Sequence, residues 1–139
     1  MTAPAYQQMI FLNLPVNDLD ASKKFFTELG YPINEQFSDD TTASVVISET
    51  IVAMVHTHEK YAQFTKKPIA DATKTSEVLI ALSAESREKV DELVDKALAA
   101  GGSVSGETQD HGFMYGRAFD DLDGHTWEVV WMDPSAVEG

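Results

Sequence analysis

The pattern of apolar and polar positions predicts that the chain opens with a strand and an amphipathic helix. An apolar run at residues 9–16 predicts the strand, and apolar side chains then recur at helical spacing up to residue 29. Asn17 and Asp18 can cap the start of this helix, and Gly30 supplies its C-terminal stop. Three short strand-like segments follow, at residues 31–37, 43–48 and 51–56.

The second half of the chain follows the same order of predicted elements. Residues 78–82 read as a strand, and apolar side chains from Val90 to Leu98 recur at the spacing of an amphipathic helix. The glycine pair at residues 101–102 ends this helix. Further strands are predicted at residues 103–107, 113–119 and 125–132. A short helix at residues 59–64 and a polar connector separate the two halves.

This repeat predicts the fold class. Each half reads β-α-β-β-β, so the class is α+β, with two units at about residues 6–57 and 76–133 in one domain of residues 1–139. Two strand-rich units in so small a domain must share a core. The alternative is an unrelated α+β sandwich whose halves match by chance. The agreement of element order, helix position and turn placement favours the repeat.

Composition and charge exclude several classes of function. The content of 43% hydrophobic and 24% charged residues is typical of globular proteins, and the net charge of −13 argues against binding to nucleic acid. The absence of cysteine excludes disulfides, thiolate nucleophiles and cysteine-ligated zinc. No apolar stretch approaches the roughly 18 residues of a membrane span. The N-terminal segment lacks the basic region of a secretory signal, so we expect a cytoplasmic protein without nucleic-acid or membrane partners.

Two stretches of the chain resemble a known superfamily. They are VNDLDASKKFFTELGY at residues 16–31 and FDDLDGHTWEVVW at residues 119–131. Both resemble the vicinal oxygen chelate superfamily, which includes glyoxalase I, bleomycin and fosfomycin resistance proteins, extradiol dioxygenases and methylmalonyl-CoA epimerase. LPVNDLDASKKFFTELG and GFMYGRAFDDLDGHTWEVVWM are particularly similar to a branch described as predicted lactoylglutathione lyases. The resemblance implies two βαβββ units in a cupped mixed sheet with helices outside, a homodimer, and a small-molecule ligand or substrate in the cup.

The resemblance also implies where a divalent cation would be held. In the metal-dependent members, the first and fourth strands of each unit supply one ligand each, and the cation acts as a Lewis acid on two neighbouring substrate oxygens. The residues at these positions are Phe11, Met54, Leu79 and Glu128. Phe, Met and Leu cannot bind a hard cation, so only one position is suitable.

A shifted set of ligands remains an alternative. Residues two apart on a strand share a face, so three polar residues could join Glu128 in a metal site from adjacent positions: Asn13, His56 and Glu77. Such positions are roughly 6.6 Å apart along a strand, whereas metal bonds are about 2.0 to 2.6 Å long. The shift would therefore have to be concerted, and the identity of any cofactor stays open.

Glu128 is the candidate catalytic residue, and its partner depends on the last turn. If that turn closes at residues 121–124, Arg117 lies opposite Glu128 on the neighbouring strand. An arginine offers a carboxylate two parallel hydrogen bonds. A tighter loop would break this register. We expect Arg117 or a hydroxyl network, rather than a metal, to hold Glu128, and the spacing selects none of the four histidines as a base.

Two main functions are consistent with these residues. One is a glyoxalase-like lyase or isomerase with Glu128 as its base or sole retained metal ligand. The other is a metal-free protein of the bleomycin-resistance type that sequesters a hydrophobic or planar small molecule. A third possibility is a dimeric scaffold whose site has no remaining catalytic chemistry. The ligand pattern favours the second and third, and no residue identifies the substrate. The predicted lining of the cup is Phe11, Asn13, Met54, His56, Leu79, Tyr115 and Arg117.

Overall fold

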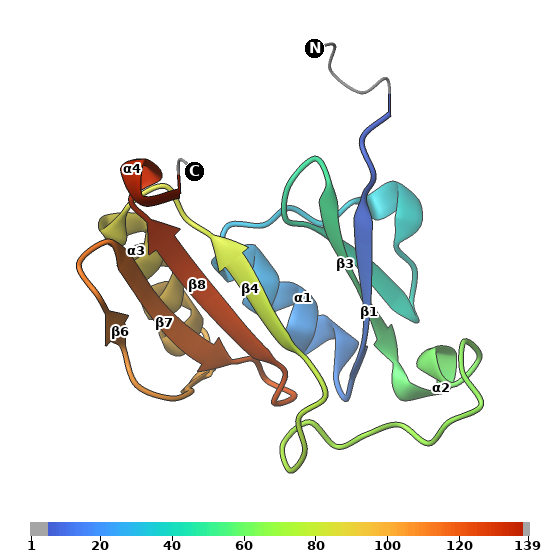
Figure 1. The fold of residues 1–139 in the computed structure, drawn as a ribbon. Coiled ribbons are helices and arrows are strands. Elements are labelled where there is room, and N and C mark those ends of the chain that lie inside the picture. Colours follow the sequence, from blue (N-terminus) through green and yellow to red (C-terminus); the bar gives the residue numbers. More distant parts are fainter. Residues whose placement is uncertain (1–5, 138–139) are drawn as a thin grey trace. The chain divides into compact units, whose positions relative to one another are not determined.

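The computed structural model describes residues 6–137 of the chain. Residues 1–5, which begin the segment assessed above for a secretory signal, and residues 138–139 lie outside this described part. The chain divides into two compact units, Met1–Ile69 and Ala70–Gly139, and each contains one sheet and one long helix (Figure 1). Both sheets are mixed, which confirms the predicted α+β class. No helix within residues 6–137 is long and apolar enough to cross a membrane.

The first unit is built on a sheet with the strand order β1-β3-β2. β1 (Ile10–Val16) runs parallel to β3 (Ile51–Thr57), and β2 (Thr42–Val46) runs antiparallel to it. The long helix α1 (Leu19–Glu28) follows β1 and contacts β2 and β3. Alternate side chains of a strand point to opposite faces. The fully buried set on the face covered by α1 comprises Ala43, Val45, Ala53 and Val55.

Local chemistry defines both ends of α1. The Asp18 carboxylate accepts a hydrogen bond from the N–H of Ala21 at 3.0 Å, which satisfies one free donor of the first turn. Gly30 follows the helix with φ 103°, and the N–H of Tyr31 returns to the carbonyl of Phe26 at 3.1 Å. The predicted cap and stop are confirmed.

The strand predicted at residues 31–37 is wrong over most of its length. This segment pairs with β2 through the bridge between Ile33 and Val45, and it then forms the short helix η1 (Glu35–Phe37). The side chain of Asn34 accepts a hydrogen bond from the N–H of Gln36 at 3.0 Å and so caps η1. Capping of a local helical turn by Asn34 is therefore favoured over continued strand pairing in this segment.

A short helix ends the first unit. α2 (His58–Tyr61) is capped at its N-terminus by Thr57, whose hydroxyl accepts a hydrogen bond from the N–H of Lys60 at 3.2 Å. The sequence predicted a helix at residues 59–64. The chain instead continues after Tyr61 as turns, with the N–H of Phe64 bonded to the carbonyl of Tyr61.

The second unit repeats the arrangement with a larger sheet. The strands β4 (Leu79–Ser83), β8 (Thr126–Met132), β7 (Met114–Asp120) and β5 (Ser103–Val104) lie side by side in that order, and β6 (Gln109–Asp110) pairs with β7 separately. β4 is parallel to β8, whereas β7 is antiparallel to it. The single strand predicted at residues 103–107 is shorter than expected. Gly106, at φ 70°, lies between β5 and β6.

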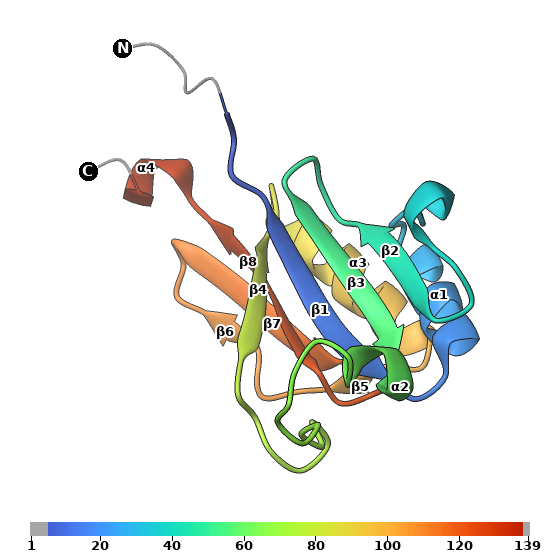
Figure 2. The same ribbon diagram turned by 90° about the vertical axis from the view of Figure 1, so that its right-hand side faces the viewer.

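One face of the second sheet is covered by its long helix. α3 (Arg87–Ala99) contacts β7 and β8 and runs behind them in Figure 1. The buried apolar residues on this face of the sheet and on α3 are Ile80, Leu82, Phe119, Trp127, Val129, Val90, Val94 and Ala97. Gly101 ends α3 with φ 113°, as predicted. The remaining helix is α4 (Pro134–Val137). Figure 2 shows β1, β3 and β2 of the first sheet side by side in this order.

Candidate functional site

The strand register of the first sheet arranges the face that turns away from α1, here called the second face, in rows. Residues that are paired across neighbouring strands share a face. Three successive rows run from apolar to polar: Phe11–Val52–Val46, then Asn13–Met54–Ser44, then Pro15–His56–Thr42. Phe11 is 55% exposed, so its ring is available to a ligand rather than used in the core.

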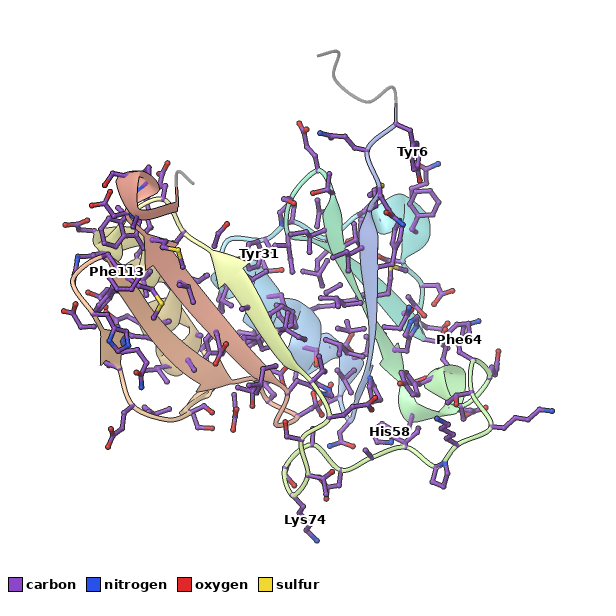
Figure 3. All side chains as sticks on the ribbon, viewed as in Figure 1. Tyr6, Tyr31, His58, Phe64, Lys74 and Phe113 are labelled. Carbon is purple, nitrogen blue, oxygen red and sulfur yellow. The ribbon has the colours of Figure 1, made fainter. Side chains whose placement is uncertain are left out.

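His56 forms the centre of a hydrogen-bond network on this face. Its side chain is only 2% exposed, with Nδ1 at 2.7 Å from Oγ1 of Thr42 and Nε2 at 2.8 Å from Oδ1 of Asn13. The amide oxygen of Asn13 can only accept, so Nε2 carries the proton and Nδ1 accepts a hydrogen bond from the Thr42 hydroxyl. The ring of Phe64, which lies beside α2 (Figure 3), is 5.0 Å from the imidazole.

The surroundings of His56 favour its neutral form. Burial lowers the pKa of the imidazole, and the positive charge of Lys60 lowers it further, against the opposing charge of Asp39. A metal-bound histidine uses the lone pair of a ring nitrogen. In His56 one nitrogen carries a proton and the other accepts a hydrogen bond, so this arrangement leaves no lone pair for a cation.

Glu128 lies on the second face of the second sheet, which turns away from α3. The register places it between Ala81 of β4 and Ala118 of β7, and its neighbours along β8 on this face are Thr126 and Val130. The side chain is half-buried, and within residues 6–137 no group forms a hydrogen bond or ion pair with its carboxylate. Because both flanking side chains are methyl groups, the carboxylate extends beyond them.

The predicted pairing of Arg117 with Glu128 is wrong. The loop between β7 and β8 spans residues 121–125 rather than 121–124, which shifts the register by one position. Ala118 therefore faces Glu128, and Arg117 faces Val129. A shift of one residue moves a side chain to the other face of a sheet, so Arg117 lies on the face covered by α3.

Arg117 and Tyr115 both contact α3 and do not line the second face, where the sequence placed them. Nη1 of Arg117 donates to Asp91 at 2.8 Å and to Asp95 at 3.0 Å. The Tyr115 hydroxyl donates to the same Asp91 carboxylate at 2.6 Å. Hydrogen bonds from Tyr115 and then from Arg117 lower the pKa of Asp91. These residues therefore hold the helix on the sheet.

Asp121 selects the longer loop between β7 and β8. Its buried carboxylate accepts hydrogen bonds at 3.0 Å from the backbone N–H groups of Asp123 and His125 and from the indole of Trp127. Burial raises the pKa of Asp121, while the positive charge of His125 and these hydrogen bonds oppose the rise. By ordering the loop, Asp121 sets the register that puts Glu128 on the second face.

Sequence reasoning missed a second arginine cluster in this unit. Both terminal nitrogens of Arg87 donate to Asp110 at 2.9 Å, and one also donates to the carbonyl of Gly112 at 3.0 Å. The guanidinium carbon lies 5.0 Å from the centroid of the Tyr115 ring and 5.3 Å from that of Trp131. The hydrogen bonds from Arg87 contribute most to the pKa of Asp110 of about 2. Arg87 and Asp110 lie far apart in the sequence, and no spacing signal joins them.

The residues present do not fit a divalent cation at the positions that the resemblance implies. Phe11, Met54 and Leu79 offer no oxygen or nitrogen donor. Of the shifted set, His56 is engaged as described, and Glu77 is exposed in a bend before β4. Among the described residues, no three His, Asp or Glu side chains gather in a metal-binding arrangement.

Known proteins share this fold. The sequence profile of the Glyoxalase/Bleomycin resistance protein/Dioxygenase superfamily matches residues 8–129. The chain matches none of the curated proteins. It is similar to the structure of the hypothetical protein SA1046 from S. aureus, with 29% identity, a TM-score of 0.75, and coverage of 91% of this chain and 95% of that chain.

Two more distant structures carry informative descriptions. A glyoxalase/bleomycin resistance protein/dioxygenase family enzyme from Burkholderia phytofirmans PsJN has 18% identity and a TM-score of 0.73, and the match covers 91% of this chain and 99% of that chain. The fosfomycin resistance protein FosX from Mesorhizobium loti has 11% identity and a TM-score of 0.68, with coverage of 94% and 97%. Identities this low show the shared fold alone.

Proposed function

Because the chain belongs to the glyoxalase/bleomycin resistance protein/dioxygenase superfamily, we propose that it binds a planar, largely apolar small molecule on the second face of its first sheet, without a metal ion. The observation that carries this proposal is Phe11, a 55% exposed aromatic ring at a position where the resemblance implies a metal ligand. In the second sheet, Leu79 makes the same replacement and is 57% exposed.

The chemistry of the first sheet supports an apolar ligand. Phe11 begins a row that continues with the buried Val52 and the partly exposed Val46, so the ring lies at the edge of an aliphatic surface. Removing a side chain of this size from water stabilises a complex by about 1.5 to 3 kcal/mol. The proposal includes the features expected from the sequence, namely one domain of residues 1–139, a homodimer and a cytoplasmic location.

Equilibrium dialysis with 2-acetylnaphthalene tests the proposal. We expect binding that is unchanged by prior chelator treatment and by added Mn²⁺, and about tenfold weaker binding for Phe11→Ala. The matched control is Phe37→Ala, which removes a ring that is 62% exposed on η1. Binding that disappears on chelation and returns with metal would overturn the proposal, as would equal affinities of Phe11→Ala and the wild type.

A second candidate function is that of a glyoxalase-like lyase or isomerase, in line with the similarity to predicted lactoylglutathione lyases. The observation that favours it is Glu128, a carboxylate between two alanines with no partner among residues 6–137. A general base requires such an available group. The test is turnover of the hemithioacetal of methylglyoxal and glutathione. Activity that falls at least about 100-fold in Glu128→Gln would favour this function over simple binding.

A further inference from the structure

The side-chain amide of Asn13 belongs to the His56 network. Its Oδ1 accepts a hydrogen bond from Nε2–H of His56 at 2.8 Å, and the other imidazole nitrogen accepts from the Thr42 hydroxyl at 2.7 Å. In this arrangement the oxygen of the amide is turned toward His56 and its NH₂ group is not used by the imidazole.

The Nδ2 group of Asn13 is consequently a donor with unused capacity. It carries two N–H groups, and within the described part of the chain its contact is the Phe11 carbonyl at 3.5 Å, which is long for a hydrogen bond. Asn13 is exposed and lies two residues along β1 from Phe11 on the same face. A molecule stacked on the Phe11 ring thus lies within reach of a fixed N–H donor.

We propose that Asn13 recognises an acceptor oxygen, such as that of a neutral ketone or amide, at the edge of the ligand bound on Phe11, and that His56 and Thr42 are positioning residues for it. This inference rests on the proposed function and names its ligand class. The net charge of −13 disfavours a carboxylate in this role, because the protein repels anions. The ligand is therefore planar and apolar with one uncharged carbonyl-type oxygen.

Two probes of the same shape isolate the proposed hydrogen bond. The first is 2-acetylnaphthalene, and the second is 2-isopropenylnaphthalene, in which a CH₂ group replaces the carbonyl oxygen. We expect the wild type to bind the ketone about 2- to 10-fold more tightly than the alkene, which is the range of one neutral hydrogen bond. The side-chain amide proton signals of Asn13 should shift further downfield with the ketone than with the alkene, because only the ketone accepts a hydrogen bond from them.

Asn13→Asp tests the donor directly. An aspartate still offers an oxygen to His56, but it replaces Nδ2 with a second acceptor, so the preference for the ketone should disappear or reverse. Gln36→Glu is the matched control, because it makes the same change from amide to carboxylate at an exposed position on η1. The control should retain the wild-type preference. A ketone preference that persists in Asn13→Asp would overturn the inference.

Thr42→Val tests the positioning role. Without the hydroxyl, Nδ1 of His56 loses its hydrogen-bond partner and the imidazole is held less firmly against Asn13, so the ketone preference should shrink although Asn13 is intact. Thr42→Ser restores the hydroxyl and should restore the preference, which a purely structural role of Thr42 would not require. Equal binding of both probes by the wild type would overturn this inference and leave the proposed function intact. Failure of both probes to bind would overturn both.

Discussion

The two units share an order of elements, yet they treat the main polar side chain of their second faces in opposite ways. In the first unit, His56 is buried and both of its ring nitrogens are hydrogen-bonded. In the second unit, Glu128 lies between Ala81 and Ala118, and residues 6–137 offer its carboxylate no partner. The imidazole of His56 therefore has hydrogen-bond partners for both nitrogens, whereas the carboxylate of Glu128 remains available to a ligand.

This difference separates two uses of a polar group on one scaffold. A satisfied network fixes geometry, because each hydrogen bond restricts the next, and it can present a donor such as Asn13 in a defined direction. An unpaired carboxylate stays available to contact a ligand. Breaking each arrangement should therefore have unequal effects on stability.

The largest expected effect comes from Gly124, which lies in the loop between β7 and β8 of the second unit. A Cβ at this position would lie 2.8 Å from the backbone nitrogen of Thr73 and 2.9 Å from the carbonyl of Ala72, and φ is +87°. Gly124→Ala should therefore lower the free energy of unfolding by about 2 to 5 kcal/mol in urea denaturation.

Gly112 is the matched control for this substitution. Its φ is +81°, but no other atom lies within 4 Å of the position that a Cβ would occupy. Gly112→Ala should then show only the backbone penalty of about 1 to 2 kcal/mol. Equal losses for the two variants would contradict the close approach of Gly124 to residues 72–73.

The next largest effect concerns the His56 network of the first unit. Thr42→Val keeps the shape of the side chain but leaves a buried imidazole nitrogen without its donor, which should cost about 1 to 3 kcal/mol. Thr41→Val is the control, because the Thr41 hydroxyl bonds to Asp39 in an exposed position. Its loss should stay below about 0.5 kcal/mol. Similar losses at the two threonines would indicate that the network is not stabilised by burial.

His56 also predicts a pH dependence of the stability of the first unit. Burial and Lys60 lower the pKa of His56 below its ordinary 6.5, so the unfolded chain binds the proton more readily. The stabilisation that results from this lowered pKa is fully present above the pKa of His56 in the unfolded chain. It is lost as the pH falls through the lowered pKa of His56 in the folded protein. Urea denaturation from about pH 7 to 5 should show this loss in the wild type and a flatter profile in His56→Gln. The same slope in the wild type and in His56→Gln would contradict this prediction.

The smallest expected effect is at Glu128. Because Arg117 faces α3, Glu128→Gln should change the free energy of unfolding by less than about 0.5 kcal/mol. A double-mutant cycle with Arg117→Met should give a coupling near zero, whereas the cycle of Arg117→Met and Asp91→Asn should give about 0.2 to 1 kcal/mol for this partly exposed pair. A larger coupling between Arg117 and Glu128 would restore the register that the sequence suggested.

The fold class and the order of the main elements were predictable, because the signals behind them are local. Asp18, Gly30 and Gly101 mark helix ends through their own backbone chemistry, and the structure confirms all three. The strand expected at residues 31–37 failed because capping at Asn34 outweighed a weak alternation of apolar residues. Local competition of this kind is difficult to judge from a single sequence.

The candidate site was only partly predictable, because it depends on pairings between distant segments. Asn13 and His56 were both recognised as polar residues of the second face, but their contact with each other depends on the parallel register of β1 and β3. The error at Arg117 arose from one extra residue in a loop that the buried carboxylate of Asp121 organises. A one-residue change in loop length is enough to exchange the two faces of a strand.

The tryptophan fluorescence of this protein reports on its second unit and not on its first. Both of its tryptophans belong to that unit: Trp127 is 1% exposed and donates to Asp121, and Trp131 lies under the Arg87 guanidinium. Intrinsic tryptophan emission therefore follows the loop at residues 121–125 and the face packed on α3. The first unit has no indole to report a disturbance of the His56 network, so the absorption of its tyrosines, Tyr6, Tyr31 and Tyr61, is the signal that follows this unit.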